Sequence, residues 1–410
     1  MLLPNLFIFA FIALNLVLSV GALANERTEA ARALMQAQLE ARYGAITQAM
    51  EPMADGGARY RFESPAIRAD NDAQLWLHDG ETEDVVVLLH GLSDSPYFMT
   101  AVARDFYDAG ADVVIALLPG HGSIEGMPAM RVPALYQAWI ATAGETVAVA
   151  RELAPRVSIG GFSTGGLLSL YTALDRPQEV NGGVFLFSAA LDFPRGAKWP
   201  GYAAESFYPP FAWLADRSAT WLTGFIDDSK WNAVRDCAPV NPYRYRALPR
   251  YGAYHLGRLR EVTLNLLDRY PLAQPLFVAH SLHDKTAFVR GLEFVLDRRP
   301  EGSATAYMPI CDVRPGNCID EPDAAQIDPA TKSTCFSWTQ ADDYDDRAAK
   351  ACGVRHSSLI LAEPITRDGV FFEPANPDYA VLSSEMLAFF DTAVRRDAPY
   401  DGSHLQARCP

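Results

Sequence analysis

The feature that most limits the fold is an alternation of short apolar runs with helical patterns. Two of the runs, VVVLL at residues 85–89 and VVIALL at residues 113–118, contain no polar residue. A strand with apolar side chains on both sides must be buried on both faces, as the strands of a parallel sheet are. Crossover helices are predicted at residues 96–109, 133–153, 165–175, 286–298 and 379–395. The chain is therefore expected to have an α/β fold with a mostly parallel sheet and helices on both faces.

Two insertions divide the predicted core. The core is expected to cover residues 59–190 and 263–398, with strands in the runs AQLWLH, DVVVLLH, DVVIALL, RVSIGG, GGVFLFSAA, QPLFVAHS and SATAYMPI. Residues 191–262 are rich in aromatic residues and proline, and they begin where another strand would follow. Residues 311–352 form a second insertion, which is acidic and holds four cysteines.

The N-terminal part of the chain has the features of an export signal followed by a helix. Residues 1–24 are largely apolar and end in the A-x-A arrangement, Ala22 and Ala24, after which signal peptidases cut. The segment lacks Lys and Arg and is nearly long enough to span a bilayer, so a retained membrane anchor is the alternative. Residues 26–50 are rich in Ala, Leu, Glu and Arg, which predicts a helix within an N-terminal helical segment of residues 25–58. In either case the body is expected to be exported, as a periplasmic or secreted protein.

The cysteines agree with an oxidising compartment. Their number is even, as disulfide-bonded exported proteins favour. They lie at positions Cys237, Cys311, Cys318, Cys335, Cys352 and Cys409. Proximity in the sequence favours the pairs Cys311–Cys318 and Cys335–Cys352, each closing a short loop, although 15 pairings are open to six cysteines. Buried free thiols are the alternative.

Composition and charge limit the class of ligand. With 49% hydrophobic and 21% charged residues, the chain has the composition of a folded globular protein. Its formal net charge of −15 leaves no basic excess to neutralise phosphates, so nucleic acid is not expected as a partner. Small, neutral or apolar ligands remain open.

A serine between glycines marks the first candidate for chemistry. Residues 161–165, GFSTG, match the pattern G-x-S-x-G and stand between the strand RVSIGG and the helical pattern LLSLYTAL. A serine hydroxyl becomes a useful nucleophile only when it is held in the open beside a base. A tight turn from strand to helix holds it so, and small flanking residues are then required because neighbouring chains approach closely. Ser163 is the predicted nucleophile, and a glycine-rich structural turn is the alternative.

A second loop is placed to stabilise negative charge. His90, Gly91 and Leu92 follow the buried strand VVVLL, at a position from which a backbone N–H can point at a developing oxyanion. We expect the backbone amides of Leu92 and Thr164 to form this oxyanion hole. His90 is expected to hold the loop by hydrogen bonds rather than to act as a base.

Together these motifs resemble the α/β-hydrolase superfamily, in its carboxylesterase and monoglyceride-lipase-like (serine aminopeptidase-like) branch. The resemblance is carried by HGLSDSP at 90–96, LLPGHGS at 117–123, GFSTGG at 161–166, VAHSLHDKTA at 278–287 and HSSLIL at 356–361. It implies an eight-stranded sheet with the nucleophile after strand 5, an acid after strand 7 and a histidine after strand 8. It also implies a cap inserted after strand 6, where residues 191–262 lie.

The acid and the base follow from the order Ser, Asp, His that the resemblance implies. Asp284 comes directly after the run PLFVAHS, and its role would be to accept the Nδ1 proton of the histidine. Asp94, Asp192 and Asp312 are its rivals. His356 remains as the base once histidines that precede the serine, or lie in the cap, the acid's loop or the tail, are set aside. The insertion before His356 departs from the family pattern and leaves the path of its loop open.

These residues predict a serine hydrolase that cleaves carboxylic esters, of small molecules or lipids, through an acyl-enzyme on Ser163. An acyltransferase and a peptidase or amidase would use the same three side chains, and a non-catalytic binding protein is a more remote alternative. No cofactor and no metal are expected, because no zinc, P-loop or dinucleotide motif is present. The acidic runs QADDYDDRA and EPDAAQID lack EF-hand spacing and are expected to be solvated surface.

Overall fold

The centre of the fold is a nine-stranded sheet. The computed structural model describes residues 26–193, 241–245, 250–282, 284, 286–310, 326–327, 334–335, 356–368, 370–373 and 375–406. Its strands are β1 (Thr47–Pro52), β2 (Ala58–Glu63), β3 (Ala73–Leu77), β4 (Asp84–Leu89), β5 (Asp112–Ile115), β6 (Arg156–Phe162), β7 (Val184–Phe187), β8 (Leu276–Ser281) and β9 (Thr305–Ile310). In the described part their order is β1-β2-β3-β5-β4-β6-β7-β8-β9, and the strands from β5 to β9 in this order are parallel. The predicted, mostly parallel sheet is thereby confirmed.

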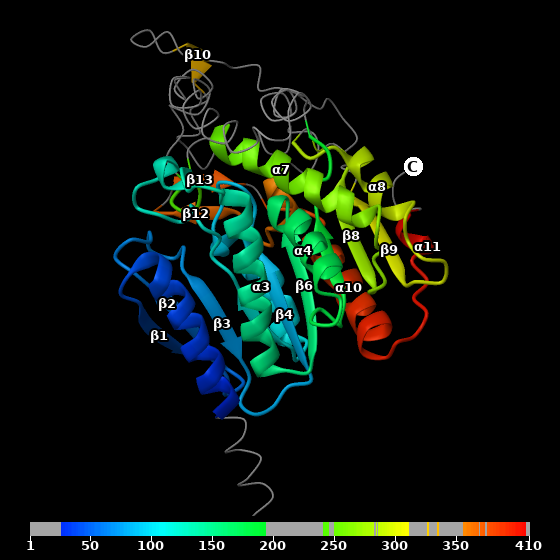
Figure 1. Cartoon of the computed structure of the whole chain (residues 1–410), viewed down its shortest axis with the longest axis horizontal. Coiled ribbons are helices and arrows are strands. Elements are labelled where there is room, and N and C mark those ends of the chain that lie inside the picture. The colour runs from blue at the N-terminus through cyan, green and yellow to red at the C-terminus, as the bar shows by residue number, and fades with distance from the viewer. Residues whose placement is uncertain are drawn as a thin grey trace, which may run out of the picture.

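Helices cover both faces of this sheet, as Figure 1 shows. One face packs on α3 (Leu135–Leu153), α4 (Thr164–Asp175) and α7 (Arg250–Leu267), and the other on α2 (Thr100–Asp108) and α10 (Tyr379–Phe389). The apolar run of β4 serves both sides, because Val85 and Val87 belong to the first core whereas Val86 and Leu88 belong to the second. The α/β fold predicted from fully apolar strands is confirmed.

Shorter elements complete the described chain. They are η1 (Pro96–Met99), η2 (Met127–Met130), η5 (Val289–Leu292), α8 (Glu293–Leu296), β10 (Gln326–Ile327), β11 (Thr334–Cys335), η6 (Ser357–Ile360), β12 (Ile365–Arg367), β13 (Val370–Glu373), a π-helical turn (Phe390–Arg395) and α11 (Ser403–Gln406). The hairpins β10–β11 and β12–β13 stand apart from the main sheet.

The N-terminal segment differs from the prediction. Residues 26–43 form a helix, but it ends before residue 50, because Gly44 adopts a φ of +75°. The following residues form β1, which pairs antiparallel with β2 and adds an edge strand to the expected eight. Strands β1 and β2 carry many polar side chains, so they lack the apolar run that marked the predicted strands. β3 lies in the predicted run AQLWLH, is buried throughout and pairs antiparallel with β2.

Several predictions on domain boundaries lie outside the described residues. The leader of residues 1–24, most of the cap of residues 191–262 and most of the insertion of residues 311–352 belong there, together with both favoured disulfides. Within the described ranges, no helix has the length and apolar character to cross a membrane.

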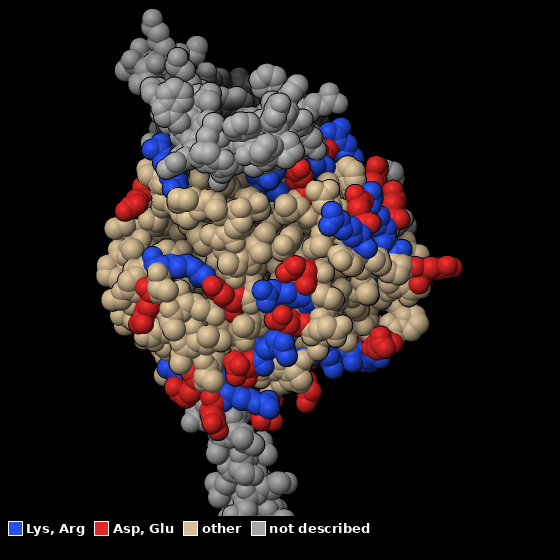
Figure 2. All heavy atoms as spheres, in the orientation of Figure 1, with Lys and Arg blue, Asp and Glu red and all other residues tan. Residues whose placement is uncertain are grey.

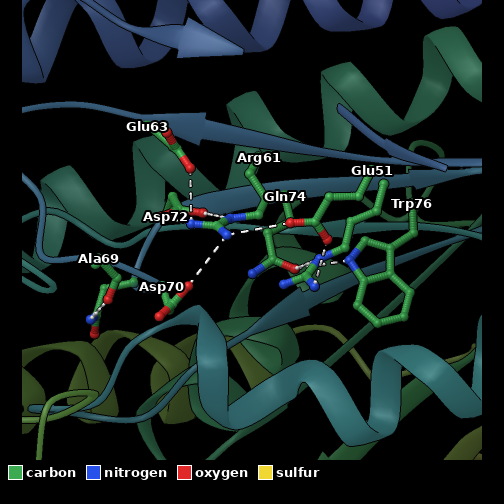
Figure 3. A network of polar contacts seen from close by, with 10 residues as sticks. Glu51, Arg61, Glu63, Ala69, Asp70, Asp72, Gln74 and Trp76 are labelled. Carbon is green, nitrogen blue, oxygen red and sulfur yellow. Dashed lines mark hydrogen bonds and ion pairs between the residues drawn. The ribbon is translucent and has the colours of Figure 1, made fainter. Parts of the chain in front are cut away.

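A polar network ties the antiparallel strands together (Figure 3). The guanidinium of Arg61 on β2 lies 2.8 Å from Asp72, 3.0 Å from Glu63 and 3.3 Å from Asp70. Asp72 is only 2% exposed, so its charge depends on this partner. The hydrogen bond with Asp72 accordingly raises the pKa of Arg61 above its usual value. A charge pair of this kind is costly to break from one side.

Replacing Arg61 by methionine is therefore expected to lower the free energy of unfolding by about 3 kcal/mol, because Asp72 would stay buried without its cation. Urea unfolding followed by circular dichroism measures the loss. Glu51→Gln is the matched control, since Glu51 contacts Arg61 at 3.4 Å from a half-exposed position and should change stability by less than about 1 kcal/mol. Equal losses in both variants would contradict the prediction.

Figure 2 shows how the charged side chains are distributed over one face of the molecule. On the face shown, Lys and Arg side chains are interspersed with Asp and Glu, and the described residues form no continuous basic patch there. The view agrees with the expectation that nucleic acid is not a partner, which stays a prediction.

Candidate active site

Ser163 stands at the turn between β6 and α4, in a conformation that side chains rarely adopt. Its φ and ψ are +54° and −112°. Hydrogen bonds fix this turn on both sides: the Ser163 amide donates to Phe187 O at 2.9 Å, and its carbonyl accepts from the Ala190 amide at 2.9 Å. Strain held by surrounding structure is typical of a nucleophile elbow.

The glycines around Ser163 are required by close backbone contacts. A Cβ on Gly165 would lie 1.9 Å from the carbonyl oxygen of Leu89, and one on Gly161 would lie 2.4 Å from the carbonyl carbon of Gly165. Real Cβ atoms do not approach backbone so closely. The start of α4 is thus packed directly on the end of β4, as the small flanks of the GFSTGG motif predict.

The structure brings the three predicted triad side chains together. The Nε2 atom of His356 lies 2.8 Å from Ser163 Oγ, and its Nδ1 atom lies 2.5 Å from Asp284 Oδ2. Since a carboxylate only accepts, Nδ1 carries the proton, and Nε2 is free to accept the serine proton. Ser163 is 7% exposed and Asp284 6%. The Ser163 hydroxyl faces the imidazole of His356, and the carboxylate of Asp284 determines the tautomer of that imidazole.

Asp284 is held in place and in its charged form. Its Oδ1 atom accepts hydrogen bonds from the amides of Thr286 and Ala287, both at 2.8 Å. Burial raises the pKa of Asp284, but the hydrogen bond and charge of His356 and the Ala287 amide outweigh burial, so the pKa lies below its usual value. The carboxylate is therefore ionised at neutral pH.

The rival acids have other partners. Asp94 pairs with Arg244 at 2.8 Å, and Asp192 pairs with Arg290 at 2.5 Å. Asp312 lies outside the described residues. Asp284 alone of the four is placed beside His356 in the described structure.

The other described histidines are engaged elsewhere. His78 bonds Asp112 at 3.1 Å, and His280 donates from Nε2 to Ala287 O at 2.8 Å. Burial lowers the pKa of His121 and of His255 to about 4, so both are neutral at pH 7.

The loop predicted to supply one oxyanion amide is fixed by His90. This side chain is fully buried, its Nδ1 atom donates to Gly91 O at 2.9 Å, and its Nε2 atom accepts from the Leu118 amide at 3.1 Å. Burial and then the neighbouring His121 lower the pKa of His90 well below its usual value. A neutral His90 with both nitrogens bonded holds the loop, as predicted from its position after the strand.

The two predicted oxyanion donors begin at neighbouring strand ends. Leu89 of β4 is registered with Gly161 of β6, so the loop carrying Leu92 and the start of α4, which carries Thr164, share one edge of the sheet. Within the described structure, neither the Leu92 nor the Thr164 amide donates a hydrogen bond. Such unpaired N–H groups are suited to bind an oxyanion.

The described residues show no group of three His, Cys, Asp or Glu side chains that would hold a metal ion.

Arg244 contacts the candidate site, although no sequence pattern indicates it. It lies within the range of the predicted cap, residues 191–262, and pairs with Asp94. Its only signal in the sequence is a charge among the aromatic residues of YRYR, which does not reveal a long-range ion pair.

Comparison with known proteins assigns the family. The model of the Hydrolase_4 family, described as serine aminopeptidase, S33, matches residues 80–301, more than half of the chain. The chain belongs to this family. The resemblance to α/β hydrolases that the motifs carry is thereby confirmed. In this member of the family, the matched range contains Ser163 and Asp284, whereas His356 lies beyond it.

The individual proteins to which the chain is similar share less than a third of its residues in the aligned regions. A thermostable monoacylglycerol lipase of Bacillus sp. (strain H-257) is 27% identical over 199 residues, covering 48% of this chain and 70% of that protein. The structure of the metagenome-derived lipolytic enzymes LipS and LipT gives a TM-score of 0.46 at 17% identity, covering 76% of this chain and 94% of that one. A soluble variant of monoglyceride lipase from Saccharomyces cerevisiae, in complex with a substrate analogue, gives 0.46 at 11% identity, covering 84% and 95%.

Proposed function

We propose that the chain is a serine hydrolase that cleaves carboxylic esters through an acyl-enzyme on Ser163. The observation that carries the proposal is the hydrogen-bonded series Ser163–His356–Asp284, with distances of 2.8 and 2.5 Å, on a strained turn. The similarity to a monoacylglycerol lipase supports an ester of a small molecule or lipid as the substrate.

The proposed reaction has two halves. The Ser163 oxygen attacks the ester carbonyl while Nε2 of His356 takes the hydroxyl proton, and the amides of Leu92 and Thr164 bind the oxyanion. The intermediate collapses, and the alcohol leaves with the proton from His356. Water then gives its proton to His356 and attacks the acyl group, which releases the acid and restores the serine. Asp284 orients the imidazole and stabilises its charge throughout.

Labelling with a fluorophosphonate tests the proposal. We expect one label per chain, located on Ser163 by tandem mass spectrometry, and loss of p-nitrophenyl butyrate hydrolysis in proportion to labelling. Hydrolysis that persists in fully labelled protein, or a label at another serine with Ser163 unmodified, would rule the proposal out.

A peptidase activity is the second candidate, because the family description names an aminopeptidase. The same triad serves esters and amides, and the pocket decides between them. Parallel assays with p-nitrophenyl esters and aminoacyl p-nitroanilides separate the two. We expect kcat/KM to be higher for the esters. Assays with added alcohols, analysed for transfer products, separate hydrolysis from acyl transfer.

Export is the remaining part of the proposal. It is supported by the apolar residues 1–24 and the A-x-A site at Ala22 and Ala24. Cell fractionation followed by mass spectrometry of the intact protein should find a chain that begins at Asn25 outside the cytoplasm. A membrane-bound chain that keeps these residues would favour the anchor instead.

A further inference from the structure

Arg244 is a largely buried cation between two loops of the proposed active site. It belongs to the 241–245 segment, whose described residues lie beside the loop after β4. Its side chain is 14% exposed, close to the 13% of its partner Glu373. A charge so far removed from water must be matched by specific partners.

The first partner is the loop that carries Leu92. Arg244 Nη2 lies 2.8 Å from Asp94 Oδ1, two positions after Leu92. The backbone adds a second tie, because the Tyr245 amide donates to Ser93 O at 2.7 Å. The guanidinium also stacks over the Phe98 ring, 5.1 Å from its centroid. Side chain and backbone of the 241–245 segment therefore hold the same loop.

The second partner is the loop that carries His356. Arg244 Nη1 donates to Ser357 Oγ at 3.3 Å and forms an ion pair with Glu373 at the end of β13. The Ser357 hydroxyl in turn donates to Glu373 at 3.3 Å. Because Ser357 follows His356 directly, this triangle fixes the backbone next to the imidazole.

We propose that Arg244 is a positioning residue that holds the loop bearing the Leu92 amide at a fixed distance from the loop bearing His356. The inference rests on the proposed function above. The planar guanidinium engages two acidic groups at once in fixed directions, which the single ammonium of lysine does not. Without the cation, the buried carboxylate of Asp94 and the largely buried carboxylate of Glu373 lose the guanidinium that both contact, so their mutual repulsion is no longer balanced and the two loops are expected to move apart.

The consequence concerns the transition state more than substrate binding. The oxyanion amide and the imidazole act together only when charge develops on the carbonyl, so a small shift between them lowers kcat. A displacement of about 1 Å is enough to cost roughly 100-fold in rate. Removal of Arg244 should therefore lower kcat with little change in KM.

The test uses Arg244→Met, Arg244→Lys and Arg395→Met in the full chain, with p-nitrophenyl butyrate as substrate. Active sites are counted by fluorophosphonate labelling carried to completion, so that unfolded protein does not enter kcat. We expect kcat per site to fall about 30-fold in Arg244→Met, with KM within about threefold, and Arg244→Lys to recover only part of the loss. Arg395 is the matched control, because it pairs with buried Asp84 at 2.8 Å at the opposite end of β4. Its variant should lose stability but keep kcat per site.

Should Arg244→Met fail to fold, Glu373→Gln removes one charge of the same triangle and is expected to lower kcat per site about fivefold. Wild-type kcat per site in the folded Arg244 or Glu373 variants overturns the positioning role. Ser163→Ala separates this outcome from failure of the proposed function. If Ser163→Ala is inactive while the Arg244 variants keep full kcat, only the positioning role is lost. If Ser163→Ala hydrolyses the ester normally, the proposed function itself fails.

Discussion

Replacing Ser163 by alanine is expected to lower kcat for p-nitrophenyl ester hydrolysis by about 10⁴- to 10⁶-fold. The acyl-enzyme cannot form without the hydroxyl, and His356 would then face a methyl group in place of its 2.8 Å partner. A residual rate above water is expected, because the oxyanion amides and substrate binding remain. A φ of +54° is unfavourable for alanine as it is for serine, so the folding of the variant must be checked by circular dichroism.

Ser169→Ala is the matched control for this variant. Ser169 lies on α4 close to the elbow, is fully buried, and donates its hydroxyl hydrogen bond to Gly165 O at 2.8 Å. The change removes a serine hydroxyl from the same helix but not from the imidazole. Its kcat should stay within about twofold of wild type, at a stability cost of about 1 kcal/mol. Similar activity in the two variants would contradict a nucleophilic role for Ser163.

The strands whose side chains are buried on both faces of the sheet could be predicted from the sequence. Runs such as VVVLL have only one environment that suits them, the interior of a parallel sheet, and β4 occupies it. Strand β1, with the sequence TQAMEP, has no such run, and its half-exposed residues are equally compatible with the end of a helix. Its identity as a strand depends on pairing with β2, which is a long-range contact that local patterns do not contain.

The same distinction applies to the candidate site. Ser163 could be predicted because the nucleophile elbow requires small residues at adjacent positions. Gly161 and Gly165 are required there, since neighbouring backbone segments approach them closely. His356 could be predicted only from the chain order that the family resemblance implies, since it lies 72 positions after Asp284. Arg244 was not predicted, because its partners Asp94 and Glu373 come from distant segments and no local spacing relates them.

The second large effect is expected for Asp284→Asn, which should lower kcat by about 10⁴-fold while the backbone stays in place. The structure determines which way the new amide points. The amides of Thr286 and Ala287 both donate to Oδ1, so the asparagine carbonyl must occupy that position. Its NH₂ group then faces His356 Nδ1 and donates to it, which moves the imidazole proton to Nε2. In this tautomer the base cannot accept the proton of Ser163.

Asp192→Asn provides the control, since Asp192 is also buried but pairs with Arg290 at 2.5 Å away from the imidazole. Its kcat should remain within about threefold of wild type, and a 10⁴-fold loss in Asp192→Asn with an active Asp284→Asn would reverse the assignment of the acid.

The dependence of stability on pH is a second measurement of the role of Asp284. The pKa of Asp284 lies below its unfolded value, so its charge stabilises the fold above that value and loses this effect as pH falls through the folded pKa. Wild type should therefore be more stable than Asp284→Asn at pH 7, and the difference in the free energy of unfolding should shrink on acidification below about pH 4, the ordinary carboxyl range.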